Sequence, residues 1–424
     1  MKKRLNVRKW WLIGAGTIIC GVVVIALWNR PVAVKAKNLM EGITPNEAAM
    51  LEDLSSGSAE VTDFGIRLFQ TAMKEGENTL ISPLSVLSAL AMTANGAEGE
   101  TLAQMEEVLG MPVEELNSYM HTYMTQLPEG EKYKLRLANS IWFTDKETFQ
   151  VEQDFLQTNA DYYGAQLYKR TFNERAVRDI NAWVKQNTDE MIPEIVDEIS
   201  ADAVMYLVNA LAFEAEWQIV YEKRQVEEGV FTLEDGTERK AELMYSDEWG
   251  YLEDELATGF VKYYRMGEYA FVALLPKEDV SVAEYVSSLT GVHVQELLAE
   301  VSPEKVLTAI PKFEMEYNTE LKQVLMNMGM SDAFNMHTAD FSGLGQNTEG
   351  RNIYINQVLH KTYISVGEQG TRAGAATAVA LNDGSSGGPA EPPKKVYLNR
   401  PFVYMLIDTK NNLPFFIGTL MDVE

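Results

Sequence analysis

Residues 203–213 constrain the fold of this chain most strongly, because they are almost continuously apolar. The run reads AVMYLVNALAF and contains one strongly polar residue, Asn209. A strand with one solvated face alternates apolar and polar residues, whereas a strand buried on both faces is apolar throughout. We therefore expect a strand that is covered on both sides of its sheet and is interrupted by a single polar group.

Helix and strand patterns flank this run without a regular order. Ser82-Pro83 is typical of a helix start, and the apolar spacing after it predicts a helix that ends at Asn95-Gly96. Alternation over residues 135–143 predicts a strand with one buried face, and two closing strands are expected at 396–407 and 413–420. Because regular βαβ alternation is missing, we predict an α+β fold. One domain is expected over residues 58–424.

The first 57 residues differ from this domain. Residues 1–9 are basic, residues 10–28 are an uncharged run, and residues 29–57 mix Pro, Ala, Lys, Glu and Ser without periodicity. A helix of about 20 apolar residues spans a bilayer, and positive charges before it favour a cytoplasmic amino terminus. We expect residues 10–28 to be an uncleaved signal-anchor or a cleaved signal peptide, followed by a linker. The domain would then lie on the extracellular face of the cell membrane or be secreted.

Charge and cysteine content exclude several classes of partner and bond. The formal net charge is −26, although the first 37 residues contain eight basic residues and no acidic one. A domain with this much negative charge repels phosphate backbones and anionic polysaccharide. We therefore expect neither nucleic acid nor heparin as a partner. The single cysteine, Cys20, lies in the apolar run, so no disulfide can form within the domain. We expect a monomer of bacterial, extracytoplasmic type.

The sequence offers little for catalysis or metal binding. No HxxxH or HxxH pair occurs among the four histidines, His121, His293, His337 and His360. Residues 384–388, GSSGG, match the nucleophile elbow of α/β hydrolases, but that elbow must be followed by a helix and later by a histidine. Prolines follow it instead, at 389, 392 and 393, and no histidine comes after His360. We therefore expect no enzyme, no catalytic residue, no metal and no cofactor.

Residues 368–381 have an unusual composition for a surface loop. They read EQGTRAGAATAVAL, and Arg372 is the only charged residue after Glu368. Glycines disfavour a helix, but small side chains would let the segment enter a packed sheet as a strand. In that strand Thr371, Ala373, Ala375 and Thr377 would share one face. On composition alone, a plain Ala/Gly-rich connector remains the alternative.

Several motifs, in the same order along the chain, resemble the serpin family over about residues 60–424. The hinge motif of inhibitory serpins resembles Glu368–Thr371, and two closing motifs resemble Leu398–Phe402 and Pro414–Gly418. The entry to the family's second helix resembles Asn78–Ser85, and Val208–Trp217 resembles a strand of its central sheet. The resemblance implies the serpin fold, with three β-sheets, about eight to nine helices and an exposed reactive-centre loop over about residues 368–395.

The resemblance also implies three groups of site residues. The hinge would comprise Glu368, Gly370, Thr371, Ala373, Ala375, Ala376 and Thr377. The shutter, under the central sheet, would comprise Ser82, Ser85, Asn209 and His360. The breach, where insertion begins, would comprise Trp217, Lys312 and Glu368. The implied mechanism is irreversible suicide inhibition, in which a serine or cysteine endopeptidase cleaves the loop, is trapped as an acyl-enzyme, and the hinge inserts into the central sheet.

The target protease follows from the scissile bond, for which the candidates are Asp383, Gly384 and Ser385. A small residue there favours elastase-like or subtilisin-like targets. Cleavage after Asp383 would indicate a caspase-like protease, and cleavage after Leu381 a chymotrypsin-like one. The alternative function is a non-inhibitory serpin that acts as a cell-surface binding protein.

Overall fold

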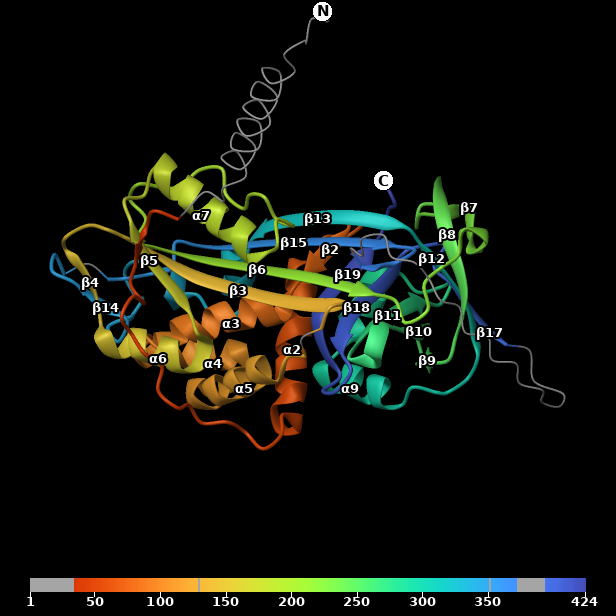
Figure 1. The fold of residues 1–424 in the computed structure, drawn as a ribbon, viewed down its shortest axis with the longest axis horizontal. Helices are drawn as coiled ribbons and strands as arrows, with labels where there is room; N and C mark the ends of the chain where they lie inside the picture. The colour runs from red at the N-terminus through yellow and green to blue at the C-terminus, as the bar shows by residue number, and fades with distance from the viewer. Residues whose placement is uncertain (1–33, 129, 351, 372–392) are drawn as a thin grey trace, which may run out of the picture.

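A computed structural model describes residues 34–128, 130–350, 352–371 and 393–424. Within them the chain forms three large β-sheets, a small two-stranded sheet and nine α-helices (Figure 1). The helices are α2 (Ser55–Ala72), α3 (Pro83–Ala94), α4 (Gly99–Leu109), α5 (Val113–Gln126), α6 (Gln153–Tyr163), α7 (Glu174–Asn187), α8 (Val282–Ser288), α9 (Gly291–Ala299) and α10 (Lys322–Met328). The predicted α+β fold, with three large β-sheets and nine helices among the described residues, is confirmed.

The largest sheet, sheet A, has seven strands and runs the length of the molecule (Figure 1). Its order is β1 (Lys37–Asn38), β5 (Gln166–Arg170), β3 (Tyr133–Thr144), β6 (Met205–Glu216), β16 (Gly370–Thr371), β15 (Gln357–Gly367) and β13 (Phe313–Glu320). Strand β6 contains the apolar run and is buried almost throughout, with α3 packed on one face of the sheet and α7 on the other. The strand covered on both faces is thus confirmed.

The other two large sheets lie near the hinge end of sheet A, which is the end that contains β16. Sheet B has the order β2 (Thr79–Ile81), β19 (Leu413–Leu420), β18 (Phe402–Asp408), β11 (Tyr269–Pro276), β10 (Ala257–Tyr263) and β9 (Tyr251–Glu253). Sheet C has the order β17 (Lys394–Tyr397), β12 (Val306–Pro311), β8 (Glu238–Glu248) and β7 (Val226–Thr232). Strands β4 (Phe149–Val151) and β14 (Gly345–Asn347) form the small sheet.

Two expected segments differ from the structure. Residues 34–57 do not form a free linker, because β1 adds to the edge of β5, the Leu51 amide donates to Thr122 Oγ1 at 2.9 Å, and α2 begins at Ser55. The strand expected at 396–407 is two strands in different sheets, because the chain turns at Leu398–Pro401 from β17 into β18. No helix of the described residues is long and apolar enough to cross a membrane, and residues 10–28 lie outside them.

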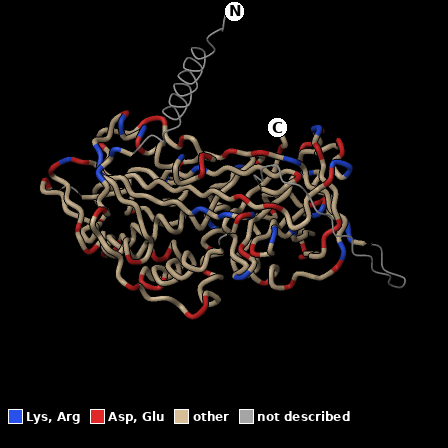
Figure 2. The backbone as a smooth tube through the Cα atoms, viewed as in Figure 1, with Lys and Arg blue, Asp and Glu red and all other residues tan. Residues whose placement is uncertain are grey.

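Charged side chains pair locally along the described chain. Lys and Arg are dispersed among more numerous Asp and Glu (Figure 2). Within sheet A, for example, Lys361 Nζ lies 2.6 Å from Glu316 Oε1, and between sheet A and α7 Arg170 Nε lies 2.9 Å from Asp179 Oδ2. In these two pairs the positive charge is neutralised by a neighbouring carboxylate.

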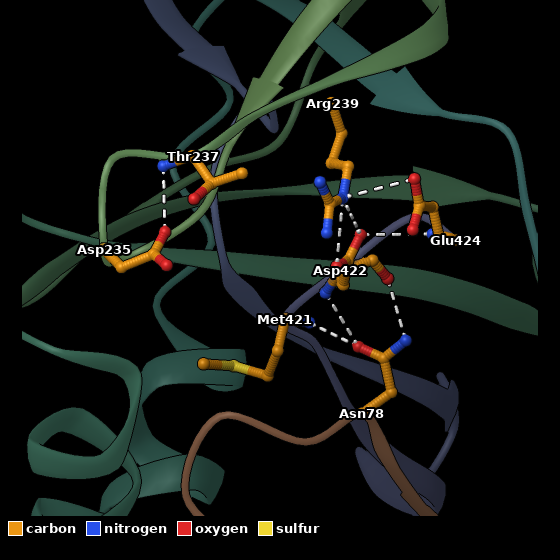
Figure 3. Close-up of polar contacts among 7 residues, drawn as sticks. All are labelled: Asn78, Asp235, Thr237, Arg239, Met421, Asp422 and Glu424. Carbon is orange, nitrogen blue, oxygen red and sulfur yellow. Dashed lines mark hydrogen bonds and ion pairs between the residues drawn. The ribbon is translucent and has the colours of Figure 1, made fainter.

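Strands β17, β18 and β19 keep the carboxyl-terminal part of the chain in place. They follow the loop in sequence, yet β18 and β19 are interior strands of sheet B with every residue buried. Asn78 fixes the end of β19: its side chain accepts from the amides of Met421 and Asp422 at 2.6 and 3.0 Å and donates to the Asp422 carbonyl at 2.8 Å (Figure 3). A cut in the loop would therefore leave both fragments associated.

We predict that Asn78→Ala lowers the free energy of unfolding by about 1–3 kcal/mol, because two amides and a carbonyl lose their partner. The measurement is the midpoint of the first urea transition. Asp235→Ala is the matched control, since Asp235 is an exposed turn residue near this cluster and its carboxylate accepts from the Thr237 amide at 2.8 Å, not from any group at the end of β19 (Figure 3). Equal midpoints for the two variants would contradict the role of Asn78.

Candidate functional site at the hinge end of sheet A

The hinge residues Gly370 and Thr371 lie inside sheet A. Gly370 pairs with Glu216 on β6 and Gly367 on β15, while Thr371 pairs with Ala215 and Val366. Thr371 is 1% exposed. Below this point β6 and β15 pair directly with each other, residues 206–211 against 357–362, in parallel. Strands β6 and β15 are therefore separated at one end by two residues of the loop and paired directly with each other over residues 206–211 and 357–362.

Gly370 allows this close approach. Its φ of +152° lies in the region that favours glycine, and a Cβ there would be 2.0 Å from the Ala215 carbonyl oxygen. Because the obstacle is backbone, no side-chain movement could relieve the contact. The hinge glycine is thus a requirement of passing beside β6.

The breach residues hold the chain just before the hinge. The Trp217 indole donates to the Gly367 carbonyl at 2.9 Å, and its backbone amide donates to the Gln369 carbonyl at 2.8 Å. Lys312 Nζ lies 3.0 Å from both Glu242 and Glu368. The three predicted breach residues therefore meet at one place, beside a groove of about 410 Å³ lined by residues 312–314 and 365–370.

Electrostatics at the breach favour the charged forms. The hydrogen bond to Glu242 raises the pKa of Lys312 against a smaller opposing effect of burial. Burial opposes ionisation of Glu368, but its backbone hydrogen bond and Lys312 outweigh burial and lower its pKa. Both side chains are partly exposed, so solvent screens this pair, and it orients the chain more than it stabilises it.

Two breach residues were missed from the sequence. Tyr264 stacks on Trp217, with centroids 4.4 Å apart and planes at 9°, and its hydroxyl lies 2.5 Å from Thr371 Oγ1. Lys262 is buried, lies 2.5 Å from Glu248 and covers the Trp217 ring at 5.4 Å. Burial opposes the charge of Lys262, but nearby Tyr221 and Glu248 raise its pKa. The only sequence signal for either residue was Lys262 itself, a lysine within the mostly apolar strand β10.

The shutter residues meet where β6 and β15 are in direct contact. His360 pairs in register with Asn209, and its Nδ1 lies 2.5 Å from Asn209 Oδ1. The Ser82 amide donates to His360 Nε2 at 3.1 Å, so Nδ1 carries the proton that Asn209 accepts. Ser85 Oγ donates to Asn209 Oδ1 at 3.4 Å. All four predicted shutter residues are brought together.

The role of Ser82 differs from the expected helix cap. Helix α3 begins at Pro83, but the Ser82 side chain makes no capping hydrogen bond. Its backbone amide serves His360 instead, which links the start of α3 to β15.

Sequence analysis also missed the extension of this cluster to β3. Asn139 pairs in register with Asn209, and its amide accepts from Ser88 Oγ at 2.9 Å and donates to the Ser85 carbonyl at 3.2 Å. Through these hydrogen bonds α3 and the residue before it contact β3, β6 and β15 in one cluster. No motif in the sequence distinguishes Asn139 from any other strand asparagine.

The remaining predicted site residues lie outside the described part of the chain. They are the hinge residues Ala373, Ala375, Ala376 and Thr377 and the scissile-bond candidates Asp383, Gly384 and Ser385. Among the described residues no His, Cys, Asp and Glu side chains form a group of three or more that could hold a metal ion.

The hinge strand β16 lies between β6 and β15 in the central sheet A, and the loop that follows it in the sequence leads to β17, an edge strand of sheet C. The family model for serpin, serine protease inhibitor, matches residues 59–423. The chain therefore belongs to the serpin family, a family of protease inhibitors that in general are not enzymes but that also includes non-inhibitory members.

Individual relatives agree with this assignment. The thermophilic serpin tengpin, solved in its native state, has a TM-score of 0.86 and 47% identity, covering 92% of this chain and all of that one. An uncharacterized serpin-like protein of Thermococcus kodakarensis is 29% identical, with 85% of this chain and 84% of that protein covered. Leukocyte elastase inhibitor of Equus caballus is also 29% identical, with 87% and 99% covered.

The shutter histidine predicts a pH dependence of stability. Burial lowers the pKa of His360 to about 3, against an ordinary value of 6.5. Between these values the unfolded chain binds a proton that the native protein does not, so stability is complete above pH 6.5 and is lost as pH falls. This group contributes a slope approaching about 1.4 kcal/mol per pH unit.

Urea unfolding of the parent and of His360→Gln between pH 6.5 and 5 measures this contribution, since glutamine keeps polar contacts but does not titrate there. We expect the variant to be less stable at pH 6.5 and to have a flatter pH profile. Parallel profiles would show that His360 is not held neutral.

Proposed function

We propose that this chain is an irreversible suicide inhibitor of serine endopeptidases, and that cysteine endopeptidases form a second target class. One observation carries the proposal: in the uncleaved chain, Thr371 already lies between β6 and β15. The residues after it in the sequence are small, with Ala373, Ala375 and Thr377 on the face that Thr371 would share. This end of sheet A is therefore prepared to receive the loop as a strand.

The chemistry is supplied by the protease. Its serine or cysteine attacks the scissile carbonyl carbon, the C–N bond breaks, the nitrogen takes the nucleophile's proton, and an ester or thioester joins the loop to the enzyme. The cut frees the hinge from sheet C, so the chain after Thr371 can continue between β6 and β15. The attached enzyme moves with it and loses the geometry needed to hydrolyse the acyl bond.

Insertion replaces one set of contacts with a larger one. Direct pairing of residues 206–211 with 357–362 is lost, and the His360–Asn209 hydrogen bond across the two strands must open. A new strand hydrogen-bonds on both of its edges and buries its side chains, so the gain exceeds the loss along the sheet. The shutter keeps the sheet closed until the cut occurs, which makes the uncleaved state kinetically persistent.

For the target we favour elastase-like or subtilisin-like proteases over caspase-like or chymotrypsin-like ones. Gly384 and Ser385 are small residues at the expected cleavage position. The relative named leukocyte elastase inhibitor aligns with this chain over 99% of its own length, and its name supports the same choice.

We further propose that the protein acts on the extracellular face of a membrane, held by residues 10–28, or is secreted. In the anchored form, the membrane segment would join the domain just before β1, at the edge of sheet A. Strand β1 aligns through β5 and β3 with Met205, whereas Thr371 aligns with Ala215. These two points on β6 are about 33 Å apart, so the hinge is well separated from the place where an anchor at residues 10–28 would join the domain.

Incubation of residues 34–424 with elastase-like, subtilisin-like, caspase-like and chymotrypsin-like proteases tests the function. We expect a complex that survives denaturing gels with one of the first two, and mass spectrometry of the released carboxyl-terminal peptide would locate the bond. Cleavage of the loop without any such complex, by every protease tried, would instead favour a non-inhibitory binding protein.

Thr371→Arg should convert the inhibitor into a substrate. The side chain at 371 is buried between two strands, so a charged residue there cannot enter the sheet. We expect the fraction of protease trapped to fall at least tenfold while loop cleavage continues. Thr371→Ser, which keeps the hydroxyl, is the control and should trap protease like the parent. Equal trapping by the arginine variant would contradict insertion through this position.

A further inference from the structure

The hinge enters sheet A before any cleavage, and the structure shows what holds it there. Gly370 and Thr371 pair with both neighbouring strands in the intact chain. The contacts of Trp217 and Lys312 reach only as far as residues 367–369. Backbone pairing with Ala215 and Val366 holds Thr371 in part, and any side-chain contact that retains it must come from a residue other than Trp217 and Lys312.

Tyr264 provides a polar partner at this depth. Its hydroxyl lies 2.5 Å from Thr371 Oγ1, and the two residues are 0% and 1% exposed. The ring cannot swing away, because it stacks on Trp217, meets Phe213 edge to face at 5.2 Å, and its amide donates to the Tyr269 carbonyl at 3.0 Å. The hydroxyl is thus held at a fixed point in the sheet where Thr371 arrives.

We propose that Tyr264 is a positioning residue of the inhibitory reaction: its hydroxyl holds Thr371 in sheet A in the uncleaved protein, so that the first residue of the inserting strand is in place before a protease attacks. The contact between Tyr264 and Thr371 rests on geometry alone, whereas its effect on inhibition rests on the proposed function. Once acylation occurs, insertion continues from a strand already begun. Without the contact, Thr371 must first enter the sheet, while hydrolysis of the acyl-enzyme competes.

The pairing of two hydroxyls makes the proposal testable by a mutant cycle. Tyr264→Phe leaves Thr371 Oγ1 buried without its partner, which favours withdrawal of the hinge. Thr371→Val leaves the tyrosine hydroxyl without its partner and has a similar effect. The double variant removes both polar groups and replaces them with apolar atoms of nearly the same shape, which restores the buried state.

The experiment compares hydrogen exchange of the segment 368–371 and of its neighbour 213–217 in the parent, both single variants and the double variant. In the parent we expect these amides to be protected. In each single variant we expect exchange at residues 370–371 to be faster by roughly 5- to 150-fold, the factor that corresponds to one unsatisfied buried hydroxyl. In the double variant exchange should return to within a few-fold of the parent.

Tyr404→Phe is the matched control. Tyr404 is also completely buried at this end of sheet B, and its hydroxyl makes no hydrogen bond to the described residues. We expect its exchange at 370–371 to match that of the parent. Parent amides that exchange without protection, a Tyr264→Phe variant that exchanges like the parent, or a double variant as fast as Tyr264→Phe would each overturn the proposal.

Trapping of an elastase-like protease by the same variants separates this proposal from the proposed function. We expect Tyr264→Phe to be cleaved more often per protease trapped, and the double variant to recover. If the exchange results hold but no variant, the parent included, forms a covalent complex, the contact is real and the inhibitory function is wrong. If the parent traps protease but its hinge amides are unprotected, the function stands and the role of Tyr264 is wrong.

Discussion

The pairing between β6 and β15 is the interaction on which the rest of this structure depends. Residues 206–211 of β6 pair directly with residues 357–362 of β15. Toward the carboxyl end of both strands, Gly370 and Thr371 lie between them instead. One sheet therefore contains both the closed and the opened arrangement of the same strands. Every other part of the site acts on the boundary between the two.

Two polar clusters set that boundary from opposite sides. At the shutter, a neutral histidine joins Asn209 to the start of α3 and so favours the closed pairing. At the breach, Trp217, Lys312 and Tyr264 hold the chain that would open it. Breaking the buried hydrogen bond between His360 and Asn209, or the one between Tyr264 and Thr371, would leave a polar group buried without its partner, which is costly. This is how a protein can remain in a less stable arrangement for long periods.

Much of the site could be predicted from the sequence because its residues are exceptions to their surroundings. Asn209 stands out in an apolar run, and residues 370–381 stand out by their small side chains, so each carried information without a structure. Tyr264, Lys262 and Asn139 could not be found in this way. Asn139 and Tyr264 are ordinary residue types at their positions, and Lys262 stands out only as a lysine in a mostly apolar strand. The roles of all three come from register and stacking between segments far apart in the chain. The packing of residues 34–54 on the domain was missed for a similar reason, since edge pairing by two residues leaves no periodic pattern.

The central claim is that the uncleaved protein is less stable than the form with its loop inserted. The direct measurement is thermal unfolding of residues 34–424 before and after a nonspecific protease cuts the loop once, with both fragments retained. The account predicts that the cut protein unfolds at a markedly higher temperature, because its hinge has become a full strand of sheet A. An equal or lower unfolding temperature would contradict it, since the loop would then have no more stable place to go.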